Sequence, residues 1–296
     1  MLDFLQNISL TTYDITLKVE TGGFLPGFTG STLRGALGHA LWRYNCRDYK
    51  RNVRPFSCGE SCSCVVGRLW LPRGQFPQGY NNRYQNAPKP FSLTAPYAPE
   101  PQLYKKGDTL KWSLTLMGDV NREFFRRILP AIEEAVQKLG SQRLVFRIEQ
   151  LSIVSETPTL AITDDDVLLE MTILTPLSIY EREKLPEELR FGLIIKHLLE
   201  RLRNLAYLYG QAQWADDDMI LAYSARAEHE VQVQKQVLRE VNIPREADKN
   251  PIVGYLGKVT YTGRWQTWLS LLLLAEQINL GRMTDMGCGH IHFSTK

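Results

Sequence analysis

The same order of apolar spacings occurs twice along the chain, and this order restricts the fold more than any other feature of the sequence. In the first half, alternating apolar residues at 11–20 predict a strand, and a period near 3.6 at 31–44 predicts a helix with one buried face. A strand at 110–116, a helix at 121–139 that is kinked at Pro130, and a strand at 144–155 are expected next. The second half starts again with a strand and a helix, and its expected elements are 167–174, 189–209, 257–262, 265–279 and 290–293. Each half therefore has the order strand, helix, strands, helix, strand, although the residues themselves do not repeat.

This order favours an α+β fold made of two ferredoxin-like βαββαβ units in tandem. At 296 residues the chain is longer than most single domains, which also indicates two domains. We expect the boundary at 155–158, which gives an N-terminal domain of residues 1–157 and a C-terminal domain of residues 158–296. Residues 72–101 are rich in Pro, Gly, Asn and Gln and are expected to form irregular connections, and 226–250 is expected to be a polar connection.

Composition and charge are those of an ordinary soluble protein, with 44% hydrophobic and 23% charged residues. A net charge of +3 permits a nucleic-acid partner without requiring one, because affinity for phosphate depends on where the cations cluster. The N-terminal residues do not resemble a secretory signal, and the longest apolar run, at 269–275, is too short to span a bilayer. We therefore expect a cytoplasmic protein with no membrane partner and with reduced cysteines.

A glycine-rich loop, Gly281-Arg282-Met283-Thr284-Asp285-Met286-Gly287-Cys288-Gly289, lies between the last expected helix and the last strand. Glycines let backbone approach a ligand closely, and successive N–H groups can form an anion-binding nest for phosphate. Arg282 and Thr284 would add a charged donor and a hydroxyl. The alternative is a helix C-cap at Gly281 followed by a turn, and the loop alone favours this alternative.

The first expected helix carries residues that its buried face does not explain. Gly35 and Gly38 lie inside it, where each costs about 1 kcal/mol relative to Ala, and both fall away from the apolar stripe. We infer that RNA or the other domain approaches this face closely. His39 also lies off the stripe, so it is a catalytic candidate or an idle surface histidine. Arg43 follows one turn later, and Arg34 lies at the edge of the stripe.

Four of the five cysteines fall in one segment, which forms an expected insertion at residues 45–70. Their spacing is C-x11-C-x3-C-x-C, and four thiolates would satisfy a tetrahedral structural zinc. An iron–sulfur cluster or a set of reduced thiols is the alternative. The zinc would stabilise the insertion without taking part in a reaction. The cysteines are Cys46, Cys58, Cys62 and Cys64.

Basic and aromatic residues occur together in and around this insertion, which is the composition of a surface that binds single-stranded RNA. The cations are Arg43, Arg47, Lys50, Arg51, Arg54 and Arg68, and the aromatic residues are Trp42, Tyr44, Tyr49, Phe56 and Trp70. A second basic group, Lys196, Arg201 and Arg203, lies on the helix at 189–209 and favours a solvated helix face. The two histidines of the last strand, His290 and His292, are expected to be an exposed pair, with weak metal binding as the alternative.

Three segments together resemble the RAMP superfamily, and within it the CRISPR-associated endoribonucleases of the Cas-six type. They are Phe28-Thr29-Gly30-Ser31-Thr32-Leu33-Arg34-Gly35-Ala36, the cysteine cluster that leads into Gly67-Arg68-Leu69-Trp70, and the terminal glycine-rich loop. The resemblance extends over most of the chain. This sequence departs from the family at Cys288, where a larger apolar residue is common.

The resemblance implies tandem ferredoxin-like domains and an enzyme that matures CRISPR RNA. The expected reaction is metal-independent: a 2′-OH of the repeat RNA attacks the adjacent phosphorus and leaves a 2′,3′-cyclic phosphate. It implies His39, Tyr44 and Lys50 as catalytic candidates, with no cofactor for catalysis. The RNA-binding candidates are Arg34, Arg43, Gly281, Arg282, Thr284, Gly287 and Gly289. The expected partners are precursor repeat RNA and other CRISPR effector subunits. The alternative function is a non-catalytic RAMP subunit that holds CRISPR RNA within an effector complex.

Overall fold

The structure, a computed structural model, describes residues 8–46, 64–70, 87–154, 160, 168–244 and 251–296. The chain divides into two compact units. The first comprises Met1–Ser155 and Arg203–Trp214, and the second comprises Glu156–Leu202 and Ala215–Lys296. The predicted boundary at 157/158 assigned all of the helix at 189–209 to the second domain, whereas its last residues belong to the first unit.

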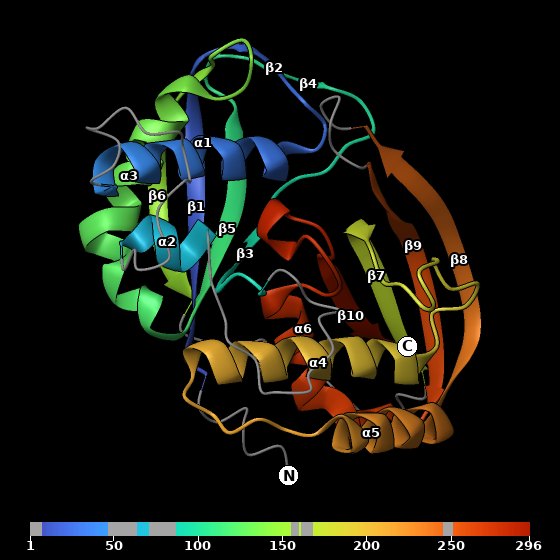
Figure 1. The fold of residues 1–296 in the computed structure, drawn as a ribbon. Helices are drawn as coiled ribbons and strands as arrows, with labels where there is room; N and C mark the ends of the chain where they lie inside the picture. Colours follow the sequence, from blue (N-terminus) through green and yellow to red (C-terminus); the bar gives the residue numbers. More distant parts are fainter. Residues whose placement is uncertain (1–7, 47–63, 71–86, 155–159, 161–167, 245–250) are drawn as a thin grey trace. The chain divides into compact units, whose positions relative to one another are not determined.

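The first unit is built on a four-stranded antiparallel sheet with the order β3-β5-β1-β6 (Figure 1). β1 (Leu10–Thr21) lies between β5 (Thr109–Met117) and β6 (Val145–Val154), and β3 (Phe91–Thr94) pairs with the outer side of β5. The helices of this unit are α1 (Thr29–Asn45), α2 (Val65–Trp70) and α3 (Leu129–Ala135). β2 (Gly23–Leu25) and β4 (Gln102–Tyr104) form a separate two-stranded ribbon.

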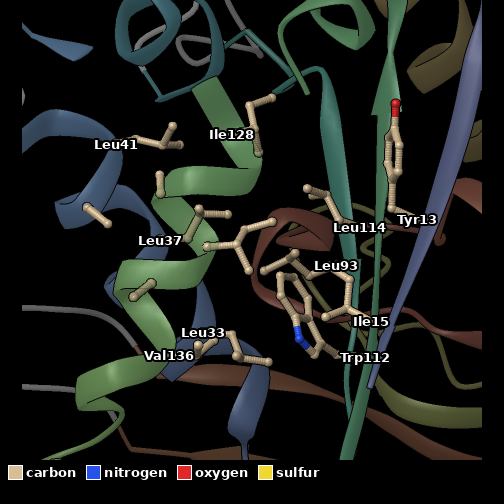
Figure 2. Packing of buried hydrophobic residues seen from close by; sticks show 14 of the residues in the cluster. Tyr13, Ile15, Leu33, Leu37, Leu41, Leu93, Trp112, Leu114, Ile128 and Val136 are labelled. Carbon is tan, nitrogen blue, oxygen red and sulfur yellow. The ribbon is translucent and has the colours of Figure 1, made fainter. Parts of the chain in front are cut away.

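Alternation along β1 places one side of the strand in the core and the other outside. Figure 2 shows the buried leucines of α1 packed against α3, its preceding turns, and the strands of the sheet. The labelled residues are Tyr13, Ile15, Leu33, Leu37, Leu41, Leu93, Trp112, Leu114, Ile128 and Val136. Truncating one such leucine to Ala typically costs about 2–5 kcal/mol, so this packing fixes which face of α1 points outward.

The predicted helix at 121–139 is divided into shorter helical types. A 3-10 helix at Gly118–Glu123 leads into a π-helical turn at Phe124–Ile128, and α3 and a final 3-10 turn at Val136–Lys138 follow. Pro130 stands in the first turn of α3. Because proline has no N–H to donate to an earlier turn, it is tolerated at the start of a helix and interrupts one that continues through it. A kink at Pro130 was predicted, but the division into 3-10, π-helical and α-helical turns was not.

The second unit has a sheet of the same connectivity, with the order β10-β7-β9-β8. Its strands are β7 (Leu168–Leu177), β8 (Val231–Ile243), β9 (Ile252–Gly263) and β10 (Ile291–Thr295). Its helices are α4 (Phe191–Tyr209), α5 (Asp217–Glu230) and α6 (Leu269–Ile278), with 3-10 turns at Trp265–Trp268 and Thr284–Met286. In both units the first strand of the motif lies between the third and the fourth, and the second strand is at the edge. The prediction of two ferredoxin-like units is therefore confirmed.

Two expected connections contain regular structure. The polar stretch at 226–250 holds the end of α5 and the long edge strand β8, so the prediction of a connection was wrong there. The irregular segment at 72–101 contains β3, which is short and is buried against β5. β8 was missed because its exposed side carries Gln, Lys and Arg, which hides the alternation that its half-buried valines provide.

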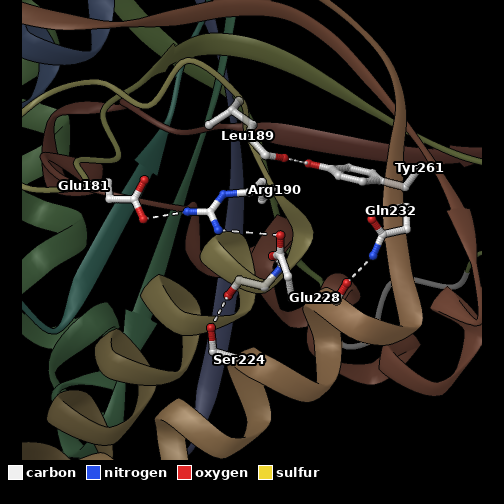
Figure 3. Close-up of polar contacts among 8 residues, drawn as sticks. Glu181, Leu189, Arg190, Ser224, Glu228, Gln232 and Tyr261 are labelled. Atoms are coloured by element: carbon white, nitrogen blue, oxygen red, sulfur yellow. Dashed lines mark hydrogen bonds and ion pairs between the residues drawn. The ribbon is translucent and has the colours of Figure 1, made fainter.

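The start of α4 is held by α5, as Figure 3 shows. A Glu228 carboxylate oxygen accepts a hydrogen bond from the Gly192 N–H at 3.0 Å, and the Ser224 hydroxyl donates to the Gly192 carbonyl at 2.9 Å. A Cβ at position 192 would lie 2.5 Å from the same carboxylate, so this close packing needs glycine. In the same region the Tyr261 hydroxyl donates to the Leu189 carbonyl at 2.8 Å.

Candidate functional site

The outward face of α1 carries the predicted catalytic histidine. His39 is exposed, as its position off the apolar stripe predicted, and Gly35 and Arg43 lie one turn on either side of it. Among the described residues, a Cβ at position 35 would meet nothing within 4 Å, so they leave the backbone of this face open to a close approach. The geometry therefore brings together an imidazole, a guanidinium and an uncovered stretch of helix.

Gly38 has a different role from Gly35. It is buried, and a Cβ there would lie 2.6 Å from the indole nitrogen of Trp70 in α2. The expectation that RNA or the other domain approaches both glycines was thus wrong for Gly38, because its close neighbour is a side chain of the same unit.

Two other predicted catalytic residues do not join His39 in the described structure. Tyr44 is 61% exposed in the last turn of α1. At about 100° per residue it lies roughly 140° around the helix from His39, so the two side chains leave from different faces. Lys50 lies outside the described residues, as do Arg47, Arg51 and Arg54 of the predicted basic surface.

The described cations of the predicted basic surface are paired with carboxylates. Arg43 forms an ion pair with Glu134 at 2.6 Å, and Arg68 pairs with Asp119 at 3.0 Å and Glu123 at 2.9 Å. The remaining RNA-binding candidate of this unit is Arg34. Its guanidinium carbon lies 5.8 Å from the centre of the Trp70 ring. In the described part of this surface, the guanidinium groups of Arg43 and Arg68 are therefore held in ion pairs.

The glycine-rich loop of the second unit owes its glycines to backbone geometry. Gly281, Gly287 and Gly289 have φ values of +80°, +91° and +72°, in the left-handed region that favours glycine. A Cβ at position 289 would lie 1.7 Å from the Leu280 carbonyl oxygen. The loop after α6 is therefore a turn that requires glycine, as the alternative interpretation predicted.

The amides of this loop are already used within the unit. The Arg282 N–H donates to the Ser178 carbonyl at 3.0 Å, and the Gly289 N–H donates to the Pro176 carbonyl at 3.0 Å. The Gly287 N–H donates to the Thr284 carbonyl at 3.1 Å. These three N–H groups are therefore not available to an anion-binding nest, and the turn that the loop alone favoured is the observed form.

Arg282 is the exposed cation of the loop, whereas Thr284, Gly287 and Gly289 are buried. The guanidinium carbon of Arg282 lies 4.6 Å from the centre of the Tyr180 ring. The Tyr180 carbonyl oxygen lies 3.1 Å from Nε2 of His197 in α4, and burial lowers the pKa of this histidine. No spacing signal indicated that Tyr180 would lie beside Arg282, because the two residues are far apart in the chain.

Comparison with known families extends over nearly the whole chain. A family model described as an N-terminal domain matches residues 7–172. The model of the CRISPR-associated endoribonuclease Cas6 matches residues 171–291. The C-terminal part of the chain, residues 171–291, belongs to the Cas6 family. The chain is accordingly an RNA-cleaving enzyme of CRISPR RNA processing, and the resemblance drawn from its motifs is confirmed.

Solved Cas6 structures share the fold over the full length. A structure described as a Cas6 product complex has 17% identity and a TM-score of 0.57, and the match covers 97% of this chain and 99% of that one. Thermus thermophilus Cas6 has 15% identity and a TM-score of 0.56, with 97% and 98% covered. A partial Cas6-RT-Cas1–Cas2 complex has 13% identity and a TM-score of 0.61, covering 98% of this chain and 46% of that one. No curated protein sequence matches the chain.

The two described members of the predicted cysteine site lie at the ends of neighbouring helices. Cys46 is buried directly after α1, and its N–H donates to the Trp42 carbonyl at 3.0 Å. Cys64 is half-buried before α2, and its sulfur accepts a hydrogen bond from the Gly67 N–H at 3.3 Å. Cys58 and Cys62 lie outside the described residues, so the four-thiolate site stays a prediction. Within the part of the chain that the structure describes, no group of three or more His, Cys, Asp or Glu side chains could hold a metal.

Two interpretations of charged groups in the second half were wrong. Arg203 is buried, and its guanidinium carbon lies 4.2 Å from the centre of the Trp214 ring, so it does not belong to a solvated face. His290 is half-buried and its pKa is lowered to about 4 by burial, while the exposed His292 pairs with Glu276 at 3.2 Å. Across the described ranges, no helix is both long and apolar enough to span a membrane.

Proposed function

We propose that this Cas6-family chain cleaves the repeat RNA of a CRISPR precursor transcript without a metal ion. The 2′-OH of one nucleotide loses its proton to a base, and its oxygen attacks the adjacent phosphorus. The bond from phosphorus to the 5′ oxygen of the next nucleotide breaks, and that oxygen takes a proton from an acid. The products are a 2′,3′-cyclic phosphate and a 5′-OH.

The observation that carries this proposal is the exposed His39 beside the open backbone at Gly35 on α1. A histidine titrates near neutrality, so it suits either proton transfer of the reaction. A ribose–phosphate backbone can approach α1 closely at Gly35, because no side chain stands there. Tyr44 and Lys50 stay proposed contributors to orientation and charge.

Arg43 would supply positive charge next to the scissile phosphate. Its present partner, Glu134, makes an ion pair in which the two side chains are 45% and 23% exposed. The Arg43 guanidinium is the more exposed of the two groups, and a phosphate accepts charge-assisted hydrogen bonds from a guanidinium as a carboxylate does. Arg34 and Arg282 are the other cations that we assign to RNA binding.

A four-cysteine zinc site would serve the structure and not the reaction. The sulfur of Cys64 already accepts an N–H hydrogen bond, as a metal-bound thiolate does, and Cys46 is anchored at the end of α1. We propose that Cys46, Cys58, Cys62 and Cys64 hold Zn²⁺ when it is present. Metal analysis of the purified protein tests this, with one zinc per chain expected and less than half in a Cys64→Ser variant.

Structures described as Cas6 product complexes support RNA as the partner of this chain. The alternative function is a subunit that holds CRISPR RNA and does not cut it. The similarity to a Cas6-RT-Cas1–Cas2 complex supports this alternative, because that Cas6 is part of an assembly. We propose other CRISPR subunits as partners of this chain in addition to the RNA.

The test is cleavage of repeat RNA in excess EDTA by the wild type, His39→Ala and His229→Ala. His229 is an exposed histidine on α5 and is the matched control. We expect the wild type and His229→Ala to cut equally and His39→Ala to be slower by about 100-fold or more. Full activity of His39→Ala would refute the assignment of this residue. Binding without cutting by the wild type would favour the alternative function.

A further inference from the structure

The β2–β4 ribbon of the first unit presents an exposed apolar pair. Phe24 lies directly opposite Leu103 in the ribbon, so the two side chains leave from the same face. They are 48% and 52% exposed. The next residues point the other way: Leu25 is buried, and the ring centre of Tyr104 lies 6.2 Å from that of Phe146. One face of the ribbon is thus fixed to the core while the other carries an aromatic ring into solvent.

A tight turn directly after β4 presents two lysines. The Asp108 N–H donates to the Lys105 carbonyl at 3.0 Å, and the Asp108 carboxylate accepts the Lys105 N–H at 2.8 Å. The Gly107 N–H ties the turn to the Val19 carbonyl at 2.9 Å. Lys105 and Lys106 are exposed on this rigid turn.

A second turn is attached to the ribbon from the other side. Leu139 and Leu144 pair across it, and the side-chain oxygen of Gln142 accepts a hydrogen bond from the Phe24 N–H at 2.8 Å. The next residue, Arg143, is exposed, and Lys138 is exposed just before the turn. The hydrogen bond that Gln142 accepts from Phe24 therefore attaches a turn with two exposed cations to the ribbon.

The charges around the ribbon are unbalanced toward positive. Within the described ranges, no carboxylate forms an ion pair with the side chains of Lys105, Lys106, Lys138 or Arg143. Two of the nearby carboxylates already have partners: Asp108 accepts the Lys105 N–H, and Glu20 pairs with Arg147 at 2.8 Å. A third, Glu100, is exposed. An aromatic ring bordered by cations that lack carboxylate partners is the combination that binds single-stranded nucleic acid.

We propose that the β2–β4 ribbon is a stacking platform for an unpaired nucleotide of the bound RNA, with its phosphates held by Lys105, Lys106 and Arg143. The proposal rests on the RNA substrate of the proposed function. An association of two copies through this face is less favoured. A two-fold contact would bring the cations of one copy against the same cations of the other, and these like charges repel.

The platform serves nucleotides other than those at the cut. Phe24 precedes α1 by five residues, and His39 lies ten residues into that helix, which corresponds to about 15 Å along its axis. The ribbon would therefore hold RNA that flanks the reacting nucleotides.

The experiment measures binding of fluorescent 12-nucleotide oligoadenylate and oligouridylate by the full chain across a salt series. The variants are Phe24→Ser, Phe24→Trp and Lys105→Gln/Lys106→Gln, and Leu221→Ser is the control because Leu221 is 50% exposed on α5. We expect Phe24→Ser to weaken oligoadenylate binding about fivefold or more and to reduce the preference for adenine, while Phe24→Trp retains both. The double lysine variant should reduce the slope of log K against log salt by about 1.4.

Three other outcomes of the Phe24→Ser measurement distinguish the platform from the proposed cleavage and from dimer formation. Unchanged affinity and adenine preference in Phe24→Ser would overturn the platform even if the wild type cuts repeat RNA. Weakened binding in Phe24→Ser with no cutting by the wild type would retain the platform and overturn the proposed cleavage. If Phe24→Ser instead converts a dimer to a monomer in sedimentation without changing RNA affinity, the face binds a second copy and the proposal is wrong.

Discussion

Replacing the two glycines of α1 one at a time should give opposite results for stability. Alanine in a helix interior is favoured over glycine by about 0.5–1 kcal/mol. At position 35 a Cβ meets no described atom within 4 Å, so Gly35→Ala should raise the free energy of unfolding by this amount. At about 2–4 °C per kcal/mol for a unit of this size, its melting temperature should rise by about 1–4 °C.

Gly38→Ala places the same methyl group 2.6 Å from the Trp70 indole nitrogen. Overpacking of a core costs about 1–3 kcal/mol, which exceeds the helix gain and leaves a net loss of up to about 2.5 kcal/mol. Because Trp70 also stacks on Phe91 at 4.9 Å between ring centres, the indole cannot move away freely. In a Trp70→Leu background the penalty of Gly38→Ala should disappear, and this double-mutant cycle isolates the contact.

Cleavage separates the two variants in a second way. Although more stable, Gly35→Ala should cut repeat RNA at least tenfold more slowly, because its methyl group stands where the RNA backbone approaches His39. Differential scanning calorimetry and single-turnover cleavage in EDTA measure the two effects. If both variants are equally stabilised, the packing of Trp70 on α1 is wrong. A Gly35→Ala variant that cuts at the wild-type rate would show that RNA does not approach this face.

Two further predictions concern the second unit. The pKa of Glu170 is lowered by hydrogen bonds from Lys258, at 2.7 Å, and from Lys296. Its contribution to stability is therefore full above about pH 4.3, the pKa of an unfolded glutamate, and is lost as pH falls through the lowered folded value. Urea denaturation of Glu170→Gln should show a weaker loss of stability between pH 5 and about 3 than the wild type, and an identical acid profile would contradict the ion-pair assignment. Gly289→Ala should be destabilised by more than about 2 kcal/mol, because it combines left-handed φ strain with a clash against the Leu280 carbonyl; a melting temperature within one degree of the wild type would show that the loop has another conformation.

The sequence predicted those features that depend on local periodicity. The alternation of β1 and the helical spacing of α1 are strong signals, and the exposure of His39 follows from the same period. Features set by tertiary contacts could not be predicted. Gly38 is explained only by Trp70, which lies on another helix, and the partner of Arg43 is a glutamate of α3 that is far away in sequence.

The glycine-rich loop illustrates the same limit. Its glycines indicated either an anion nest or a turn, and spacing could not decide between them. The hydrogen bonds of Arg282 and Gly289 to carbonyls at the end of β7 and just beyond it decide for the turn, because they depend on where that strand lies. The exposed pair of the β2–β4 ribbon was missed because two three-residue strands are too short to show alternation.

The most direct test of the account uses a repeat RNA with a single 2′-deoxynucleotide on the 5′ side of the scissile phosphate. The purified chain is incubated in EDTA with this RNA and with the all-ribose RNA, and both binding and product ends are measured. We predict equal binding, no cutting of the deoxy substrate, and a 2′,3′-cyclic phosphate with a 5′-OH from the all-ribose RNA. Cutting of the deoxy substrate, or a requirement for added Mg²⁺, would contradict it.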